Sequence, residues 1–193
     1  MRIGVLAVQG GFAEHMAALQ KLGVDGFEIR KTADLTGEID GLILPGGEST
    51  VISRLLRQTD LFKPIKVLID GGLPVFGTCA GMILLAEIID NDPAEYFKSI
   101  DITVKRNAYG RQLGSFNTAG LFTGIGEIPM TFIRAPYIVS CGNSVQILAT
   151  VDDIQVAAES GNVLVTAFHP ELTTDLRVHQ YFLSKVSPRL ANT

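Results

Sequence analysis

The sequence predicts an α/β protein with one domain over residues 1–193: a doubly wound, mostly parallel sheet flanked by helices, with some antiparallel strands in its second half. Two observations favour this fold. In the first half, short apolar segments typical of buried strands alternate with segments of helical spacing. In the second half, strand-like segments follow one another with turns between them. The length fits one domain with a substantial core, and no repeat or linker divides the chain.

The first half opens with the apolar, β-branched run Ile3–Val8, which is typical of a strand covered on both faces. Phe12, Met16, Leu19 and Leu22 then recur at helical spacing. Pro64 fits the first turn of a later short helix. The elements expected up to this point and just beyond it are strands at 3–8, 27–29, 41–44 and 73–77, and helices at 12–22, 49–61, around 64, and 80–89.

The second half is expected to hold short strands before one closing helix. The strands are predicted at 102–104, 131–133, 145–150, 154–158 and 163–168, and the helix at about 174–186. We interpret the strands as an antiparallel extension of the sheet or as strands that complete it.

Composition excludes several classes of protein. With 47% hydrophobic and 19% charged residues, the chain is not mainly disordered. Sixteen basic against 20 acidic residues give a net charge of −4, which argues against nucleic acid or an anionic membrane as the main partner. The long uncharged stretches are interrupted by Gly, Pro and polar residues, so no membrane span is expected. Two cysteines are no disulfide framework and favour a reducing compartment, so we expect a cytoplasmic protein.

Cys79 stands between a predicted strand and a predicted helix, in the pattern G-x-C-x-G formed by Gly77 and Gly81. This is the thiol version of a nucleophile elbow, in which a sharp turn leaves no room for larger side chains two positions away. The N-terminus of the following helix favours a thiolate, and the Ala80 N–H is placed to help hold an oxyanion. An isolated cysteine is more often a buried packing residue. We keep that interpretation for Cys141, which lacks this context.

A thiol nucleophile needs a base, and the base needs an orienting group. His169 follows the apolar strand 163–168, at a strand's carboxyl end, where open α/β sheets place their sites. Pro170 favours an extended His169, so Glu171 projects to the same side and can orient the imidazole. His179 shares a helix stripe with apolar residues and is expected to be packed or half-buried. His15 is expected to be a surface or interface residue.

A glycine-rich loop, Pro45-Gly46-Gly47-Glu48, joins the strand 41–44 to the next helix. One interpretation is a helix start with Ser49 as its N-cap. A nucleotide-binding loop is poorly supported, because neither glycine signature of such loops is present. If the strands before Gly47 and Cys79 are neighbours, the Gly47 N–H is a candidate second oxyanion donor.

These motifs together resemble the class I, triad-type glutamine amidotransferases, in their order and approximate spacing. Further stretches resemble the glutaminase subunits of pyridoxal 5′-phosphate synthase: GVLAVQGGFAEH at Gly4–His15, RNAYGRQ at Arg106–Gln112, FIRAP at Phe132–Pro136 and FHPELT at Phe168–Thr173. The resemblance covers nearly the whole chain, and it implies the fold of the class I amidotransferases.

The resemblance implies a site that hydrolyses L-glutamine to glutamate and ammonia. It makes Cys79 the nucleophile, completed by His169 and Glu171. The residues that it implies at the glutamine site are Gly47, Glu48, Ser49, Arg106, Ile133 and Arg134. Neither a metal nor a cofactor is expected. It also implies a partner, a (β/α)₈-barrel synthase subunit that takes up the ammonia in a large hetero-oligomeric complex, and a glutaminase that is weak until docked.

Three other functions compete with this one. A different triad amidotransferase would feed another synthase, but the stretch 106–112 argues against it. A cysteine hydrolase or stress protein of the related superfold would also use a cysteine elbow, but lacks the His-Pro-Glu triplet after a late strand. A binding module without catalysis is disfavoured because Cys79, His169 and Glu171 are all present.

Overall fold

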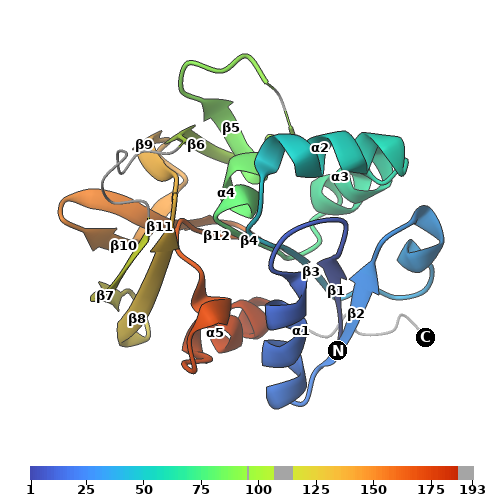
Figure 1. The fold of residues 1–193 in the computed structure, drawn as a ribbon, viewed down its shortest axis with the longest axis horizontal. Helices are drawn as coiled ribbons and strands as arrows, with labels where there is room; N and C mark the ends of the chain where they lie inside the picture. The colour runs from blue at the N-terminus through green and yellow to red at the C-terminus, as the bar shows by residue number, and fades with distance from the viewer. Residues whose placement is uncertain (95, 107–114, 187–193) are drawn as a thin grey trace.

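The computed structural model describes residues 1–94, 96–106 and 115–186. Within these residues, twelve strands form one continuous sheet with five α-helices packed against it (Figure 1). The mixed α/β architecture confirms the predicted fold class.

The parallel half of the sheet has the strand order β2–β1–β3–β4–β12. The bounds are β1 (Arg2–Leu6), β2 (Asp25–Ile29), β3 (Gly41–Leu44), β4 (Val75–Thr78) and β12 (Val163–Thr166). Every residue of β3, β4 and β12 is buried, as expected for parallel strands covered on both faces. The chain runs from β1 outward to β2 and then returns to β3 on the other side of β1. Open α/β sheets bind ligands at the carboxyl ends of strands near such a reversal.

Helices cover both faces of this half. Figure 1 shows α1 and α5 on one face, with α2, α3 and α4 on the other. The bounds are α1 (Phe12–Lys21), α2 (Ser49–Gln58), α3 (Phe62–Asp70), α4 (Ala80–Leu85) and α5 (Arg177–Lys185), with two 3₁₀ turns, η1 (Thr32–Leu35) and η2 (Pro170–Leu172). Pro64 lies in the first turn of α3, as predicted. In the described part of the chain, no helix is long and apolar enough to span a membrane.

The second half extends the sheet with antiparallel strands, as the sequence predicted. β11 (Ile154–Ser160), β10 (Gln146–Val151), β7 (Ser115–Phe122) and β8 (Gly126–Ile133) continue it in that order from β12. A branch formed by β5 (Ala86–Ile89), β6 (Ile100–Lys105) and β9 (Tyr137–Cys141) joins it through β11. In this branch β5 and β6 are parallel, whereas β9 is antiparallel to both β6 and β11. Buried and less buried residues alternate along β6 and β8, so one face of these strands packs on the core.

Some element predictions were wrong. The helix expected over 80–89 ends at Leu85, and the next four residues form β5. The reason is that the Leu84 and Leu85 carbonyls accept hydrogen bonds from the Phe97 and Ser99 N–H groups, at 2.9 and 2.8 Å, instead of continuing the helix. The strands 115–122 and 137–141 were not expected. The closing helix is shorter than predicted, from Arg177 to Lys185.

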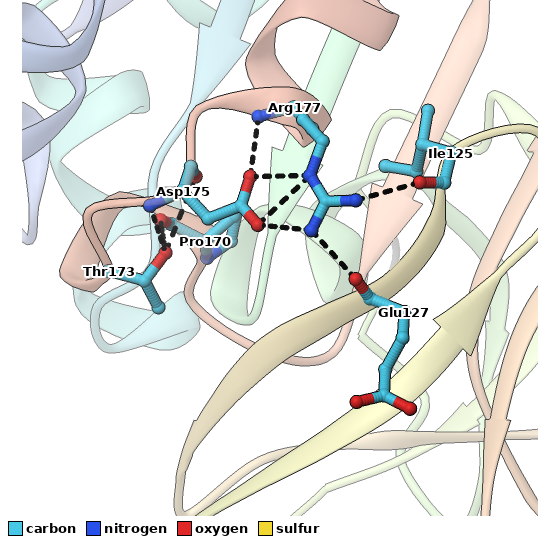
Figure 2. Close-up of polar contacts among 6 residues, drawn as sticks. All are labelled: Ile125, Glu127, Pro170, Thr173, Asp175 and Arg177. Atoms are coloured by element: carbon cyan, nitrogen blue, oxygen red, sulfur yellow. Dashed lines mark hydrogen bonds and ion pairs between the residues drawn. The ribbon is translucent and has the colours of Figure 1, made fainter.

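A salt-bridged arginine ties the β7–β8 hairpin to the segment before α5 (Figure 2). Arg177 pairs with Asp175 at 2.6 Å and donates to the carbonyls of Ile125 and Glu127, at 2.9 and 2.7 Å. Ile125 lies in the turn between β7 and β8, and Glu127 is the second residue of β8. The hairpin is therefore fixed at its turn, while its other end, at Ile133, reaches the site described next.

Candidate active site

The site lies at the carboxyl ends of three neighbouring strands. In the parallel register Leu44 of β3 is opposite Gly77 of β4, and Thr166 of β12 is opposite Thr78 of β4. The three segments that follow these strands carry Gly46 and Gly47, Cys79, and His169. The strands before Gly47 and Cys79 are therefore neighbours, and their pairing brings all three motifs to one place.

Cys79 has the strained backbone of a nucleophile elbow. Its φ is 48° and its ψ is −100°, a conformation that non-glycine residues rarely adopt. The surroundings hold this conformation, because the Cys79 N–H donates to the Thr166 carbonyl at 2.7 Å. The residue is 6% exposed, and its Sγ lies 3.9 Å from the Ile133 carbonyl oxygen at the end of β8.

The two glycines of the elbow have the steric role that the sequence suggested. A Cβ added to Gly81 would lie 2.0 Å from the Leu44 carbonyl oxygen, which belongs to the backbone of β3. A Cβ added to Gly77 would lie 2.7 Å from the Gly81 carbonyl carbon and oxygen. Larger residues at either position would therefore separate α4 from the sheet that it packs on.

His169 and Glu171 form a buried hydrogen-bonded pair. His169 Nδ1 lies 2.7 Å from Glu171 Oε1. The backbone N–H of His169 donates to the Thr131 carbonyl of β8 at 2.8 Å. The expected contact is present, but the backbone reaches it differently. Glu171 lies in the 3₁₀ turn η2, which begins at Pro170, and not on an extended segment.

The neighbours of His169 favour its charged form. Burial alone lowers the pKa of His169, but its hydrogen bonds with Cys79 and Glu171 and the charges of both outweigh burial and raise the pKa to about 10. Burial by itself raises the pKa of Glu171, whereas the neighbouring His15 and the hydrogen bond with His169 lower it below its usual value. An imidazolium between a sulfur and a carboxylate is the arrangement that a thiolate nucleophile requires.

We expect the imidazolium of His169 to persist well above neutral pH. Because its pKa is raised from 6.5 to about 10, its contribution to folding stability is full below pH 6.5 and is lost as the pH rises toward 10. A titration of histidine side-chain NMR signals measures this directly. Glu171→Gln should bring the transition to lower pH, because the variant lacks the carboxylate charge. A wild-type His169 that titrates near 6.5 would contradict the prediction.

The glycine-rich loop is held by the start of α1 and by β4. The Gly46 N–H donates to Thr78 Oγ1, and the Gly11 N–H donates to the Gly46 carbonyl, both at 2.9 Å. The Glu48 N–H donates to Gln9 Oε1, also at 2.9 Å. The described residues contain no cis peptide bond. Because the C=O and N–H of a trans peptide point in opposite directions, the Gly47 N–H points away from Gly11.

The loop ends at a helix cap that was assigned to the wrong residue. Glu48, not Ser49, is the N-cap of α2, and its carboxylate accepts from the Val51 and Thr50 N–H groups at 3.1 and 3.4 Å. Ser49 is instead the first helical residue and is buried. The hydrogen bond from the Thr50 hydroxyl lowers the pKa of Glu48, and this effect is larger than the opposing effect of burial. Glu48 therefore keeps a negative charge beside the site.

A cavity of about 510 Å³ opens over the buried triad. All the site residues predicted from the sequence except Ala80 line it, namely Gly47, Glu48, Ser49, Cys79, Arg106, Ile133, Arg134, His169 and Glu171. Ala80 is buried at the first position of α4, directly after Cys79. Of the motif at 106–112, only Arg106 is among the described residues.

The two arginines of the cavity differ in how they are held. Arg106 pairs with Asp92 at 3.1 Å and donates to the Tyr96 hydroxyl at 2.7 Å, while its Nε is buried without a hydrogen-bond partner in the described residues. Arg134 is exposed and has a φ of 44°, in the left-handed region that non-glycine residues seldom adopt. Arg106 is therefore fixed by its neighbours, whereas Arg134 is positioned by its strained backbone.

Several residues of the site were missed or misplaced from the sequence. Glu14 lines the cavity beside Gln9 and Gly10, and Thr78 anchors the glycine loop. The prediction of a surface or interface role for His15 was wrong, because His15 is fully buried, 3.5 Å from Glu171. The signal was available: Ala18 and Leu19, three and four residues later, share its buried helix face.

Of the remaining cysteine and histidine, the histidine was predicted correctly and the cysteine was not. His179 is fully buried on α5, in agreement with the packed role expected for it. Cys141 is exposed at the end of β9, so the interpretation as a buried packing residue was wrong.

Comparison with known proteins decides the family. The model of the SNO glutamine amidotransferase family matches residues 5–188. The chain belongs to this family. It is therefore an enzyme of the glutamine amidotransferase class, in agreement with the resemblance of its motifs.

Curated relatives match over nearly the full length. A protein of Desulfitobacterium hafniense is 54% identical over 187 residues, which cover 97% of this chain and 94% of the relative. Proteins of Haemophilus influenzae and Streptococcus pneumoniae are also 54% identical, each over 95% of this chain and, respectively, 97% and 96% of their own length. All three are named pyridoxal 5′-phosphate synthase subunit PdxT.

Solved structures agree with this fold. A crystal structure described as a glutamine amidotransferase is 42% identical and covers 95% of this chain and 98% of its own, with a TM-score of 0.90. A glutamine amidotransferase of Thermotoga maritima, 13% identical, covers 98% of this chain and 87% of its own with a TM-score of 0.63, which shows the shared fold alone.

Proposed function

We propose that the chain hydrolyses L-glutamine to L-glutamate and ammonia and passes the ammonia to a synthase subunit that makes pyridoxal 5′-phosphate. The observation that carries the reaction is the geometry of the site: a buried Cys79, His169 and Glu171 converge at the carboxyl ends of β4 and β12, under a cavity with acidic and basic side chains. The names of the relatives support the pathway, since each is called a subunit of that synthase.

The reaction divides into two steps at Cys79. The thiolate forms a bond to the side-chain amide carbon of glutamine, and the oxyanion that develops accepts hydrogen bonds from the Gly47 and Ala80 N–H groups. The carbon–nitrogen bond then breaks as His169 donates its proton to the leaving nitrogen, which departs as ammonia. Water gives a proton to His169 and attacks the resulting thioester, which releases glutamate and restores the thiolate. Glu171 keeps the imidazole oriented throughout.

Charged side chains around the cavity suit a free amino acid. Its carboxylate would meet Arg106 and Arg134, and its ammonium would meet Glu48, whose lowered pKa keeps it ionised. Ser49, Gly47 and Ile133 complete the walls of this glutamine site.

The expected partner is a (β/α)₈-barrel synthase subunit in a large hetero-oligomeric complex. Two exposed apolar side chains, Ile133 and Leu172, stand at the cavity and suit a docked protein. The Gly46–Gly47 loop contacts Gln9 and Gly11 at the start of α1, so a partner that presses on α1 would also adjust the oxyanion donor. The free thiols of both cysteines fit a reducing compartment, and we place the enzyme in the cytoplasm.

The decisive experiment compares wild type with Cys79→Ala, each with and without the synthase subunit, by the ammonia and glutamate that glutamine releases. We expect the alanine variant to lose activity by a factor of at least about 1,000, because the nucleophile is gone. A glutamine-directed affinity label should modify Cys79 and no residue of the variant. Unchanged hydrolysis by Cys79→Ala would overturn the reaction, and an isolated chain as fast as the docked one would overturn activation by the partner.

A further inference from the structure

Two histidines outside the triad lie in contact behind it. His15 of α1 and His179 of α5 are both 0% exposed, and His15 Nδ1 lies 3.0 Å from His179 Nε2. On its other side, His15 Nε2 lies 3.2 Å from Thr78 Oγ1 and 3.5 Å from Glu171 Oε2. The two rings thus form a continuous set of contacts between α5 and the carboxylate of Glu171.

Hydrogen bonding decides where the protons of these rings lie. Burial lowers the pKa of both rings, that of His179 to about 3, so each is neutral and has one N–H. His179 Nδ1 is buried without a hydrogen-bond partner in the described residues. A buried N–H without an acceptor is costlier and rarer than a bare nitrogen, so the proton of His179 belongs on Nε2, where it is donated to His15.

This assignment fixes the tautomer of His15. Because its Nδ1 accepts from His179, its proton lies on Nε2 and faces Thr78 and Glu171. The reverse assignment would strand an N–H on His179 and turn a nitrogen lone pair toward the Glu171 carboxylate. Both consequences are unfavourable. His179 therefore donates to His15, and the N–H of His15 lies on the side of the ring that faces Thr78 and Glu171.

Glu171 needs such a group on the side away from His169. Its Oε1 accepts from His169 at 2.7 Å, but its Oε2 is buried and has no hydrogen-bond partner in the described residues. His15 Nε2 is hydrogen-bonded with Thr78 Oγ1 at 3.2 Å and lies 3.5 Å from Glu171 Oε2, too far for a hydrogen bond but close enough for the N–H dipole to favour the negative charge of that carboxylate. Catalytic contacts that are long in an empty site commonly shorten when substrate binds.

We propose that His15, oriented by His179, is a positioning residue that keeps Glu171 ionised and directed at His169. The same His15 nitrogen contacts Thr78, whose hydroxyl accepts from the Gly46 N–H. His15 therefore also supports the loop that presents the oxyanion donor. This inference rests on the proposed roles of Cys79, His169 and Glu171.

The test compares two neutral amides at position 15 in the full chain assayed with the synthase subunit. In His15→Gln, the side-chain NH₂ reaches the place of imidazole Nε2 and keeps an N–H beside Thr78 and Glu171. In His15→Asn, the shorter amide reaches only the place of Nδ1, where it can accept from His179. We expect kcat for glutamine hydrolysis to fall about tenfold or more in His15→Asn, with KM within about twofold, and to stay near wild type in His15→Gln.

A second readout uses the chain alone and follows the rate of Cys79 alkylation by iodoacetamide against pH. The titratable groups that face Glu171 are His169 and His15, and behind His15 lie Glu14 and His179. Since a less ionised Glu171 weakens the imidazolium of His169, which stabilises the Cys79 thiolate, the rise of reactivity on the acid side should move to higher pH in His15→Asn than in wild type. His15→Gln should retain the wild-type profile.

The outcomes separate this inference from the proposed function. Wild-type kcat and an unshifted pH profile in His15→Asn would overturn the inference alone, and so would equal losses in both variants, which a merely structural role produces. A wild type that neither hydrolyses glutamine nor shows a pH-dependent thiol overturns the proposed function and the inference with it. Should His15→Asn fail to fold, His15→Leu takes its place with the same expectation.

Discussion

Gly46→Ala is expected to slow glutamine hydrolysis about 100-fold in a protein that still folds. A Cβ at this position would lie 2.2 Å from His169 Cε1 and 2.9 Å from its Nδ1. The ring cannot simply retreat, because Nδ1 is bonded to Glu171 at 2.7 Å. The imidazole must move by about an ångström, a displacement that costs roughly 100-fold in rate when a catalytic group loses its alignment.

The measurement is kcat with the synthase subunit, together with a thermal unfolding curve for each variant. Gly11→Ala is the matched control, because its Cβ would lie 3.4 Å from Glu171 Oε1, an ordinary contact. The Gly11 N–H that holds the Gly46 carbonyl is also retained. We expect this control to keep kcat within about threefold, since no catalytic atom has to move. If Gly46→Ala turned over glutamine as fast as Gly11→Ala, the position assigned to His169 would be wrong.

The parts of the site that the sequence predicts are those written in short local patterns. The glycines around Cys79 are two residues away on each side, so the pattern can be read locally. The helix of the same segment crowds Gly77, although Gly81 is crowded by Leu44 of β3. His169 and Glu171 are two residues apart, so their contact needs no knowledge of the rest of the fold. The buried parallel strands are similarly evident, because their apolar runs are continuous.

The parts that were missed depend on contacts between distant segments. His15 meets His179 at a separation of 164 residues, and no pattern around either residue indicates the other. The cap of α2 was given to Ser49 because serine is a common capping residue, but Glu48 has the extended backbone of an N-cap and its carboxylate accepts from the Thr50 and Val51 N–H groups.

The hairpin shows a different reason for error. β8 contains Pro129, and only its last three residues were predicted as a strand. A proline within a segment disfavours a central strand. β8 lies at the end of the strand order, where one side of the strand has no neighbour in the described sheet. A proline is tolerated there because an edge strand does not need every N–H. Whether a strand lies at the edge of a sheet, and so tolerates a proline, cannot be deduced until the order of the strands is known.

Gly81→Ala is expected to have the largest effect on stability. Its Cβ would lie 2.0 Å from the Leu44 carbonyl oxygen and 2.9 Å from the carbonyl carbon, so the obstacle is backbone and cannot rotate away. The start of α4 cannot shift freely either, because the Cys79 N–H is bonded to Thr166 and the whole helix is buried. We expect the free energy of unfolding in urea to fall by about 3 kcal/mol, the upper part of the range for overpacked cores.

Gly161→Ala supplies the matched control for that value. Gly161 has a φ of 55° and nothing within 4 Å of an added Cβ, so alanine there meets only the conformational cost of about 1 kcal/mol. The excess loss in Gly81→Ala over this control then measures the crowding between the elbow and β3. Equal losses in the two variants would mean that the glycine after Cys79 is not required by contact with the sheet. A clear excess would mean that the strained turn that exposes Cys79 depends on how closely α4 approaches β3.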